Sequence, residues 1–140
     1  MLKKIWIVLI TVCIVAMASG VFAQLKDGLW EITTQVQIKG MPQQMPPVTS
    51  RQCMDKSDPV PKNQDKNYDC KTTSQKISGN TINYTVECKG KDGVMVTTGK
   101  NTYTGSTMDG TTTTSFKMKG QPEMQMTSKM SGKYLGACPK

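Results

Sequence analysis

Methionine thioethers are the side chains in this sequence whose type and spacing most suggest chemistry. The stretch KGMPQQMPP, residues 39–47, places Met41 and Met45 in a polar loop that contains three prolines. Met124 and Met126, two positions apart, would lie on one face of a strand. Thioethers are natural ligands for Cu(I) and similar soft metals such as Ag(I) in an oxidising compartment. One interpretation is therefore a soft-metal site formed by Met41, Met45, Met124 and Met126.

Packing is the alternative role for these methionines. Methionine fills irregular cores well, and leucine is scarce beyond the first 23 residues, at Leu25, Leu29 and Leu135 only. Several methionines occupy apolar positions of predicted strands, namely Met118, Met124, Met126 and Met130. For these the core interpretation is favoured. For Met41 and Met45, a lid on the open end of a barrel and an exposed contact surface are the alternatives to metal binding.

The usual catalytic groups are missing. The chain has no histidine, which is the usual base for a serine or cysteine nucleophile. Its aspartates fall mostly in predicted turns, which does not suggest an acid–base pair, and no glycine-rich phosphate loop precedes a helix. We therefore expect no enzymatic activity and no cofactor.

The N-terminus has the pattern of a secretory signal peptide. Lys3 and Lys4 precede an almost wholly apolar run over residues 5–17. Small residues suited to a cleavage site follow, the last of them at Ala23. An uncleaved membrane anchor is the alternative, but the apolar run is shorter than the roughly 20 residues that a span needs. We predict a signal peptide over residues 1–23, a single domain over residues 24–140, and a periplasmic or secreted location.

Four cysteines remain in the predicted mature chain: Cys53, Cys70, Cys88 and Cys138. An even number in a short exported chain indicates disulfides, and a tetrathiolate metal site is disfavoured because no CxxC is present. If the turn Ser78-Gly79-Asn80 is centred on Gly79, opposite residues of the hairpin have numbers that sum to 158, as Cys70 and Cys88 do. We predict the disulfide Cys70–Cys88 and, by elimination, Cys53–Cys138.

Period-two alternation of apolar and polar residues recurs along the whole predicted domain. Turn signals separate about seven strands, over residues 28–38, 47–54, 67–77, 81–89, 94–104, 108–119 and 123–134. Residues 55–66, which are polar and contain two prolines, are predicted to be an irregular loop. From about residue 67 the strands form an antiparallel meander, whose apolar face must be covered by closing into a small barrel or a sandwich. The fold class is therefore all-β and disulfide-stabilised.

Several segments resemble a known family when taken in order. They are GLWEITTQVQIKGMPQQMPPVTSRQCM, ISGNTINYTVEC, YTGSTMDGTTTTSF and the closing GKYLGAC. The chain is similar over nearly its whole predicted mature length to bacterial exported proteins of the domain-of-unknown-function family 3617. The resemblance implies export and a small cysteine-stabilised domain, and it carries over no catalytic or binding residue.

The functional prediction is a non-enzymatic binding module. We expect it to bind a small apolar or amphipathic ligand, or an envelope protein, through the rim that contains Met41 and Met45. Trp30 is predicted to be a core aromatic, with ligand stacking as the alternative. Without Lys3 and Lys4 the chain carries 16 basic and 10 acidic residues. This positive charge indicates a solvated sheet face, and weak attraction to anionic envelope surfaces is the alternative. We expect no nucleic-acid binding.

Overall fold

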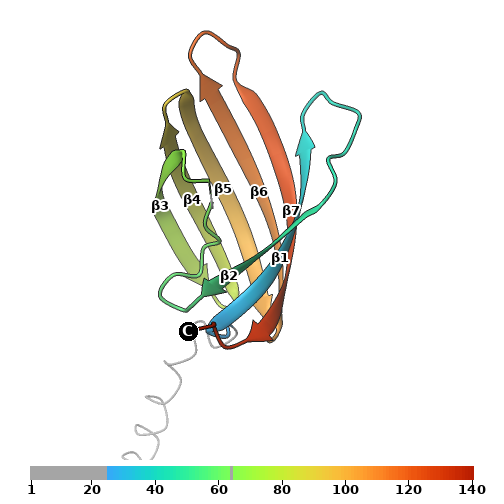
Figure 1. Ribbon diagram of the computed structural model, residues 1–140, viewed down its shortest axis with the longest axis vertical. Coiled ribbons are helices and arrows are strands. Elements are labelled where there is room, and N and C mark those ends of the chain that lie inside the picture. Colours follow the sequence, from blue (N-terminus) through green and yellow to red (C-terminus); the bar gives the residue numbers. More distant parts are fainter. Residues whose placement is uncertain (1–24, 64) are drawn as a thin grey trace, which may run out of the picture.

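Seven antiparallel strands form one curled sheet in the computed structural model, which describes residues 25–63 and 65–140 (Figure 1). The predicted signal peptide lies outside the described residues. The strands are β1 (Gly28–Ile38), β2 (Val48–Met54), β3 (Tyr68–Ser78), β4 (Thr81–Gly90), β5 (Gly93–Thr104), β6 (Thr107–Met118) and β7 (Met124–Gly136). The seven predicted strand ranges agree with these bounds to within two residues.

The strand order is β2-β1-β7-β6-β5-β4-β3. The run from β3 to β7 is the predicted meander, and β1 then pairs with β7 and carries β2 on its other side. The sheet curls into a half-barrel, with β2 and β3 as its two edge strands (Figure 1). Of the two predicted architectures, the barrel-like curl is therefore the one that forms, and not a two-sheet sandwich.

Both predicted disulfides are present. Cys70 and Cys88 are opposite each other in the register of β3 and β4, and the Cys53–Cys138 bond joins residues 85 positions apart. Two disulfides in a short chain indicate an oxidising, non-cytoplasmic compartment. Within the described part of the chain, no helix is long and apolar enough to cross a membrane.

The hydrophobic core fills one end of the half-barrel. Its centre is Trp30, which is fully buried and makes edge-to-face ring contacts with Tyr103 and Tyr134 at 5.7 and 5.6 Å between centroids. The Trp30 Nε1–H also donates to the Lys26 carbonyl at 2.8 Å, so its one polar atom is satisfied. The prediction of a core role for Trp30 is thus confirmed.

Glycines on the inner face make room for the large core side chains. A Cβ on Gly132 would lie 3.0 Å from Met108 Cε and 3.5 Å from Trp30 Cε3. A Cβ on Gly110 would lie 2.2 Å from the Asn101 Oδ1 atom. These glycines are therefore needed for packing and not for an unusual backbone conformation.

The connection between β2 and β3, which the structure describes over residues 55–63 and 65–67, is the segment that we call the strap. It is irregular, as predicted, apart from an isolated bridge between Asp55 and Asp58. The strap is mostly polar, yet two of its residues, Pro59 and Val60, are buried in the core. The Tyr103 hydroxyl also donates to the Pro59 carbonyl at 2.7 Å. The strap therefore seals the core end of the gap between the two edge strands.

Candidate functional site

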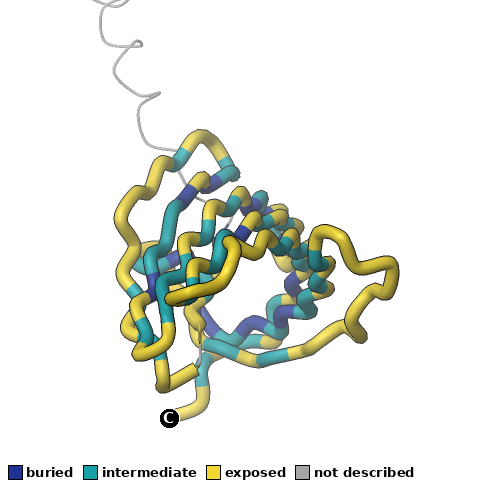
Figure 2. The backbone as a smooth tube through the Cα atoms, turned by 90° about the horizontal axis from the view of Figure 1, so that it is seen from above, coloured by how far each residue is buried: buried dark blue, intermediate teal, exposed yellow. Residues whose placement is uncertain are grey.

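A hollow of about 390 Å³ occupies the inside of the half-barrel beyond the core. Six strands, β1, β2 and β4 to β7, contribute to its wall, and the strap borders it on the side of β2. Seen along the barrel axis, the strands follow most of a ring (Figure 2). The interior of the sheet is therefore only partly filled by its own side chains.

The wall of the hollow combines apolar and hydroxyl side chains. The apolar members are Ile32, Val36, Val86, Met95, Met126 and Met130. The hydroxyl members on the strands opposite the strap are Thr34, Thr97, Thr112, Thr114 and Ser128. Such a surface suits a ligand that is mainly apolar but carries some polar atoms.

Tyr84 forms the boundary between the hollow and the core. Its ring lies across Gly99 on the neighbouring strand, where a Cβ would be only 2.3 Å from the ring atom Cζ. Tyr84 is 5% exposed, and burial raises the pKa of its hydroxyl to about 12. Tyr84 is therefore neutral at physiological pH and offers a hydroxyl, not a charge.

Asn101 lies beneath this boundary and is fully buried. Neither its Oδ1 nor its Nδ2 atom has a hydrogen-bond partner among the described residues. Burial raises the pKa of the Tyr84 and Tyr103 hydroxyls. The side-chain amide of Asn101 lies close to both and lowers these pKa values by a smaller amount. No contact between these groups has full hydrogen-bond geometry, so the polar interior of the protein is incompletely satisfied here.

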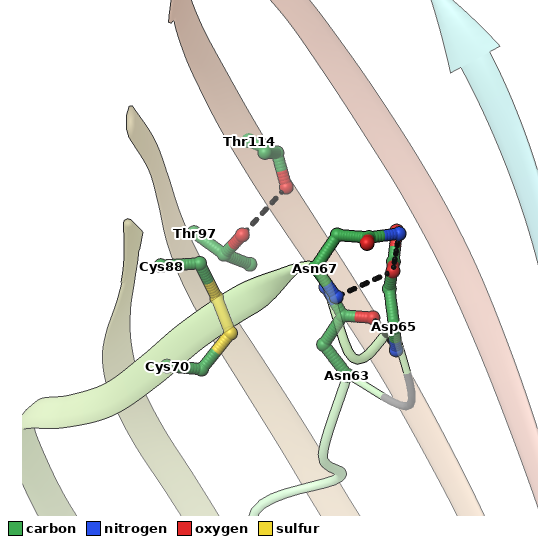
Figure 3. The surroundings of a disulfide bond; sticks show 7 residues. All are labelled: Asn63, Asp65, Asn67, Cys70, Cys88, Thr97 and Thr114. Carbon is green, nitrogen blue, oxygen red and sulfur yellow. Dashed lines mark hydrogen bonds between the residues drawn. A yellow bond between two sulfur atoms is a disulfide. The ribbon is translucent and has the colours of Figure 1, made fainter. Parts of the chain in front are cut away.

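Cys88 on β4 lines the hollow, and its disulfide bond joins it to Cys70 on β3 (Figure 3). Close to it, the Thr97 and Thr114 hydroxyls are hydrogen-bonded to each other at 2.8 Å (Figure 3). The two threonine hydroxyls on neighbouring strands thus satisfy each other, which lowers the desolvation cost of placing threonine in a half-buried position.

Among the described residues that line the hollow, Lys62 on the strap is the one with a charged side chain. The Lys62 backbone N–H donates to Gln52 Oε1 on β2 at 3.0 Å, and its ammonium pairs with Asp58. The hydrogen bond from Lys62 to Asp58 raises the pKa of the lysine, so it stays protonated. Lys62 and its neighbours Pro61 and Asn63 form the edge of the hollow nearest to solvent.

Met41 and Met45 do not line the hollow. Their side chains are 57% and 48% exposed, and the loop that carries them projects away from the barrel (Figure 2). The Gln35 Nε2–H on the outer face of β1 donates to Gln44 Oε1 in this loop at 2.9 Å. The loop is therefore an exposed flap on the outer side of the sheet and not a lid over the interior.

The four methionines of the soft-metal interpretation are not brought together. Met41 lies beside Gln125 and Thr127, which face outward, whereas Met126 lines the hollow on the inner face. Met124 is 43% exposed and does not belong to the hollow. Over the part of the chain that the structure describes, no group of three or more Cys, Asp or Glu side chains could hold a metal ion either.

Sequence reasoning did not single out the residues that line the hollow. The inner threonines were predicted only as strand residues, because a threonine has the same β-propensity whether it borders a core or a hollow. One signal was available, since Met126 was assigned to an apolar position of its predicted strand by period-two alternation. The strap residues border the hollow through contacts with residues far away in the sequence, so no local sequence pattern indicates them.

Comparison with known proteins gives one match. A family model described as Protein of unknown function (DUF3617) matches residues 25–138. No curated protein and no solved structure matches the chain.

Proposed function

The chain belongs to the DUF3617 family, and we propose that it is an exported, non-enzymatic binding module that holds a small apolar or amphipathic ligand in the hollow of its half-barrel. The observation that carries this proposal is the open interior, about 390 Å³ in volume, above a core that is otherwise well packed. The proposed ligand site is thus the interior of the sheet, and the loop with Met41 and Met45 lies outside it.

The size and lining of the hollow support a small ligand. Ligand pockets have volumes of roughly 300–1,000 Å³, and this hollow is near the lower end of that range. Met95, Met126 and Met130 are unbranched and flexible, so they can adapt to ligands of different shape.

The chemistry of the lining supports binding and not catalysis. Among the described residues that border the hollow, the polar groups are hydroxyls, amides and the ammonium of Lys62. Lys62 is held protonated by Asp58, so it is a poor base. An exported location is consistent with the two disulfides, which form in oxidising compartments.

The test combines retained-ligand detection with a blocked hollow. Native mass spectrometry of the protein purified from its own envelope should show a bound small molecule. The double variant Met95→Trp with Met126→Trp narrows the hollow, and its matched control, Val96→Trp with Thr127→Trp, places the same rings on the outer face. We expect the mass adduct to disappear in the first variant and to persist in the second. An adduct that survives in both variants would place the ligand elsewhere.

A protein contact through the exposed loop is the second candidate. Met41, Met45 and Val48 are 57%, 48% and 64% exposed, which is a high proportion of exposed apolar surface for one short segment. A photo-crosslinking residue placed at position 45 should give one discrete adduct in the native envelope. The same residue at the outer-face position 98 should give none, and equal labelling at both positions would contradict a specific contact.

A further inference from the structure

The polar groups at the strap side of the hollow are arranged as hydrogen-bond donors. They are Ser50 and Gln52 on β2 and Lys62 and Asn63 on the strap, and we call them the seam cluster. The opposite wall, on β4 to β7, carries the methionines and Val86 together with the hydroxyls of Thr97, Thr112, Thr114 and Ser128. Among the described residues of the lining, the charged and amide groups therefore lie at the strap side, and β4 to β7 contribute none.

Two backbone hydrogen bonds determine which amide atoms of the seam cluster remain available. Gln52 Oε1 accepts from the Lys62 N–H at 3.0 Å, and Asn63 Oδ1 accepts from the Asp65 N–H at 2.9 Å. Because each amide oxygen faces a backbone donor, the amide orientation is fixed and the NH₂ groups are the atoms left to bind other molecules. The cluster thus offers two amide donors, an ammonium and a hydroxyl.

We propose that the hollow takes a single-chain amphiphile with an anionic head, such as a carboxylate or a phosphate monoester. This inference rests on the proposed function and specifies its ligand class. The acyl chain lies against Met95, Met126 and Met130, and the oxygens of the head accept from Lys62, Gln52 and Asn63 at the seam. An anionic head matches a set of donors that includes a positive charge, since charge-assisted hydrogen bonds are the stronger ones.

Asp58 is the competitor for the head group. Its carboxylate pairs with the Lys62 ammonium, and it does not line the hollow itself. An entering anionic head therefore shares Lys62 with Asp58 or displaces it. This geometry predicts opposite effects for two neighbouring charges, because removal of Lys62 weakens binding of the anion and removal of Asp58 strengthens it.

The test measures the affinity of dodecanoate, dodecyl phosphate and the neutral dodecanol for the disulfide-intact protein by calorimetry. The wild type should bind both anionic probes more tightly than dodecanol. Lys62→Gln should weaken binding of the anions by about 2- to 10-fold and leave dodecanol unchanged. Asp58→Asn should strengthen binding of the anions by a similar factor.

Two further variants separate this proposal from a general loss of folding. Gln52→Glu keeps the acceptor for the Lys62 N–H but replaces the amide donor, so it should weaken binding of the anions only. Lys66→Gln makes the same charge change as Lys62→Gln on an exposed strap residue outside the hollow and should have no effect. Equal affinity for dodecanol and the anions, or equal effects of the two lysine variants, would overturn the anionic head and leave the hollow as a site for neutral ligands. If none of the three probes binds, this ligand class is refuted, while the retained-ligand experiment above still decides the proposed function.

Discussion

Gly99→Ala should destabilise the protein and obstruct the hollow at the same time. The new Cβ would lie 2.3 Å from Tyr84 Cζ and 2.5 Å from Tyr84 Oη, whereas ordinary contacts begin at 3.4 Å. The ring must therefore retreat by about 1 Å or more, and overpacking of this kind costs about 1–3 kcal/mol. Replacing a strand glycine by alanine returns roughly 0.5–1 kcal/mol through chain entropy. We expect a net loss of about 1–2 kcal/mol in the free energy of unfolding.

The assay is a double-mutant cycle that combines Gly99→Ala with Tyr84→Leu. Urea unfolding and thermal melting measure the stability of each variant. Gly99→Ala alone should lower the melting temperature by roughly 4–10 °C. In the Tyr84→Leu background the same substitution should be neutral or stabilising, because the ring that it contacts is gone. Since Tyr84 borders the hollow, the single variant should also bind amphiphiles more weakly. An unchanged melting temperature, or the same loss in both backgrounds, would refute the packing of Tyr84 over Gly99.

Three other predictions follow from the covalent framework, the buried tyrosine and the methionine loop. Cys53→Ser with Cys138→Ser should cost about 4.6 kcal/mol of unfolding free energy and Cys70→Ser with Cys88→Ser about 3.2 kcal/mol, because the first bond closes the longer loop; equal costs in urea unfolding would contradict the chain-entropy reasoning. The pKa of Tyr84 is raised to about 12 from an unfolded value near 10, so the stability that its protonated form contributes is complete below about pH 10 and is lost between about pH 10 and 12. Tyr84→Phe should flatten this alkaline decline in melting temperature, and an unchanged decline would show that Tyr84 does not cause it. Met41→Leu with Met45→Leu should leave Cu(I) uptake unchanged in competition with a chelator, since these methionines and Met126 lie on opposite faces of the sheet; reduced uptake would revive the loop as a metal site.

The parts of the fold that depend on local pattern were predictable from the sequence. The hairpin of β3 and β4 is a partial case, because its turn and the pairing of Cys70 with Cys88 were predicted but its register near the turn was not. Ser78 pairs with Thr81, so the turn is centred between Gly79 and Asn80, and a β-bulge between Thr72 and Ser74 brings Cys70 opposite Cys88. Gly79 has a φ of 61°, the left-handed conformation that such a turn needs. Trp30 was likewise predicted to be a core aromatic, and it is fully buried.

The parts that depend on distant contacts were not predictable. The pairing of β1 with β7 joins residues about 100 positions apart, and no turn specifies it. Val60 looks like one apolar residue in a charged loop, yet it is only 3% exposed because the strap crosses the gap between β2 and β3. Met41 and Met45 were predicted either to cover the interior or to form a contact surface, and a loop composition cannot tell on which side of a sheet the loop folds.

The hollow itself results from a change of side-chain size along the barrel axis. Near the core end, inner-face register positions carry large groups such as Ile32, Met108 and Tyr103, which meet across glycines. Two rows further on, the corresponding positions on β7, β6 and β5 are the small residues Ser128, Thr112 and Gly99.

A curled sheet keeps a nearly constant interstrand spacing, so its radius does not shrink where its side chains become small. Volume that aromatic rings occupy at the core end is therefore left open beside Ser128 and Thr112. Selection for stability alone would place larger apolar residues at these positions, because filling space in a half-buried interior is favourable. The threonines and serine that stand there keep the space open and line it with hydroxyls, which is the arrangement that a binding site requires and a core does not.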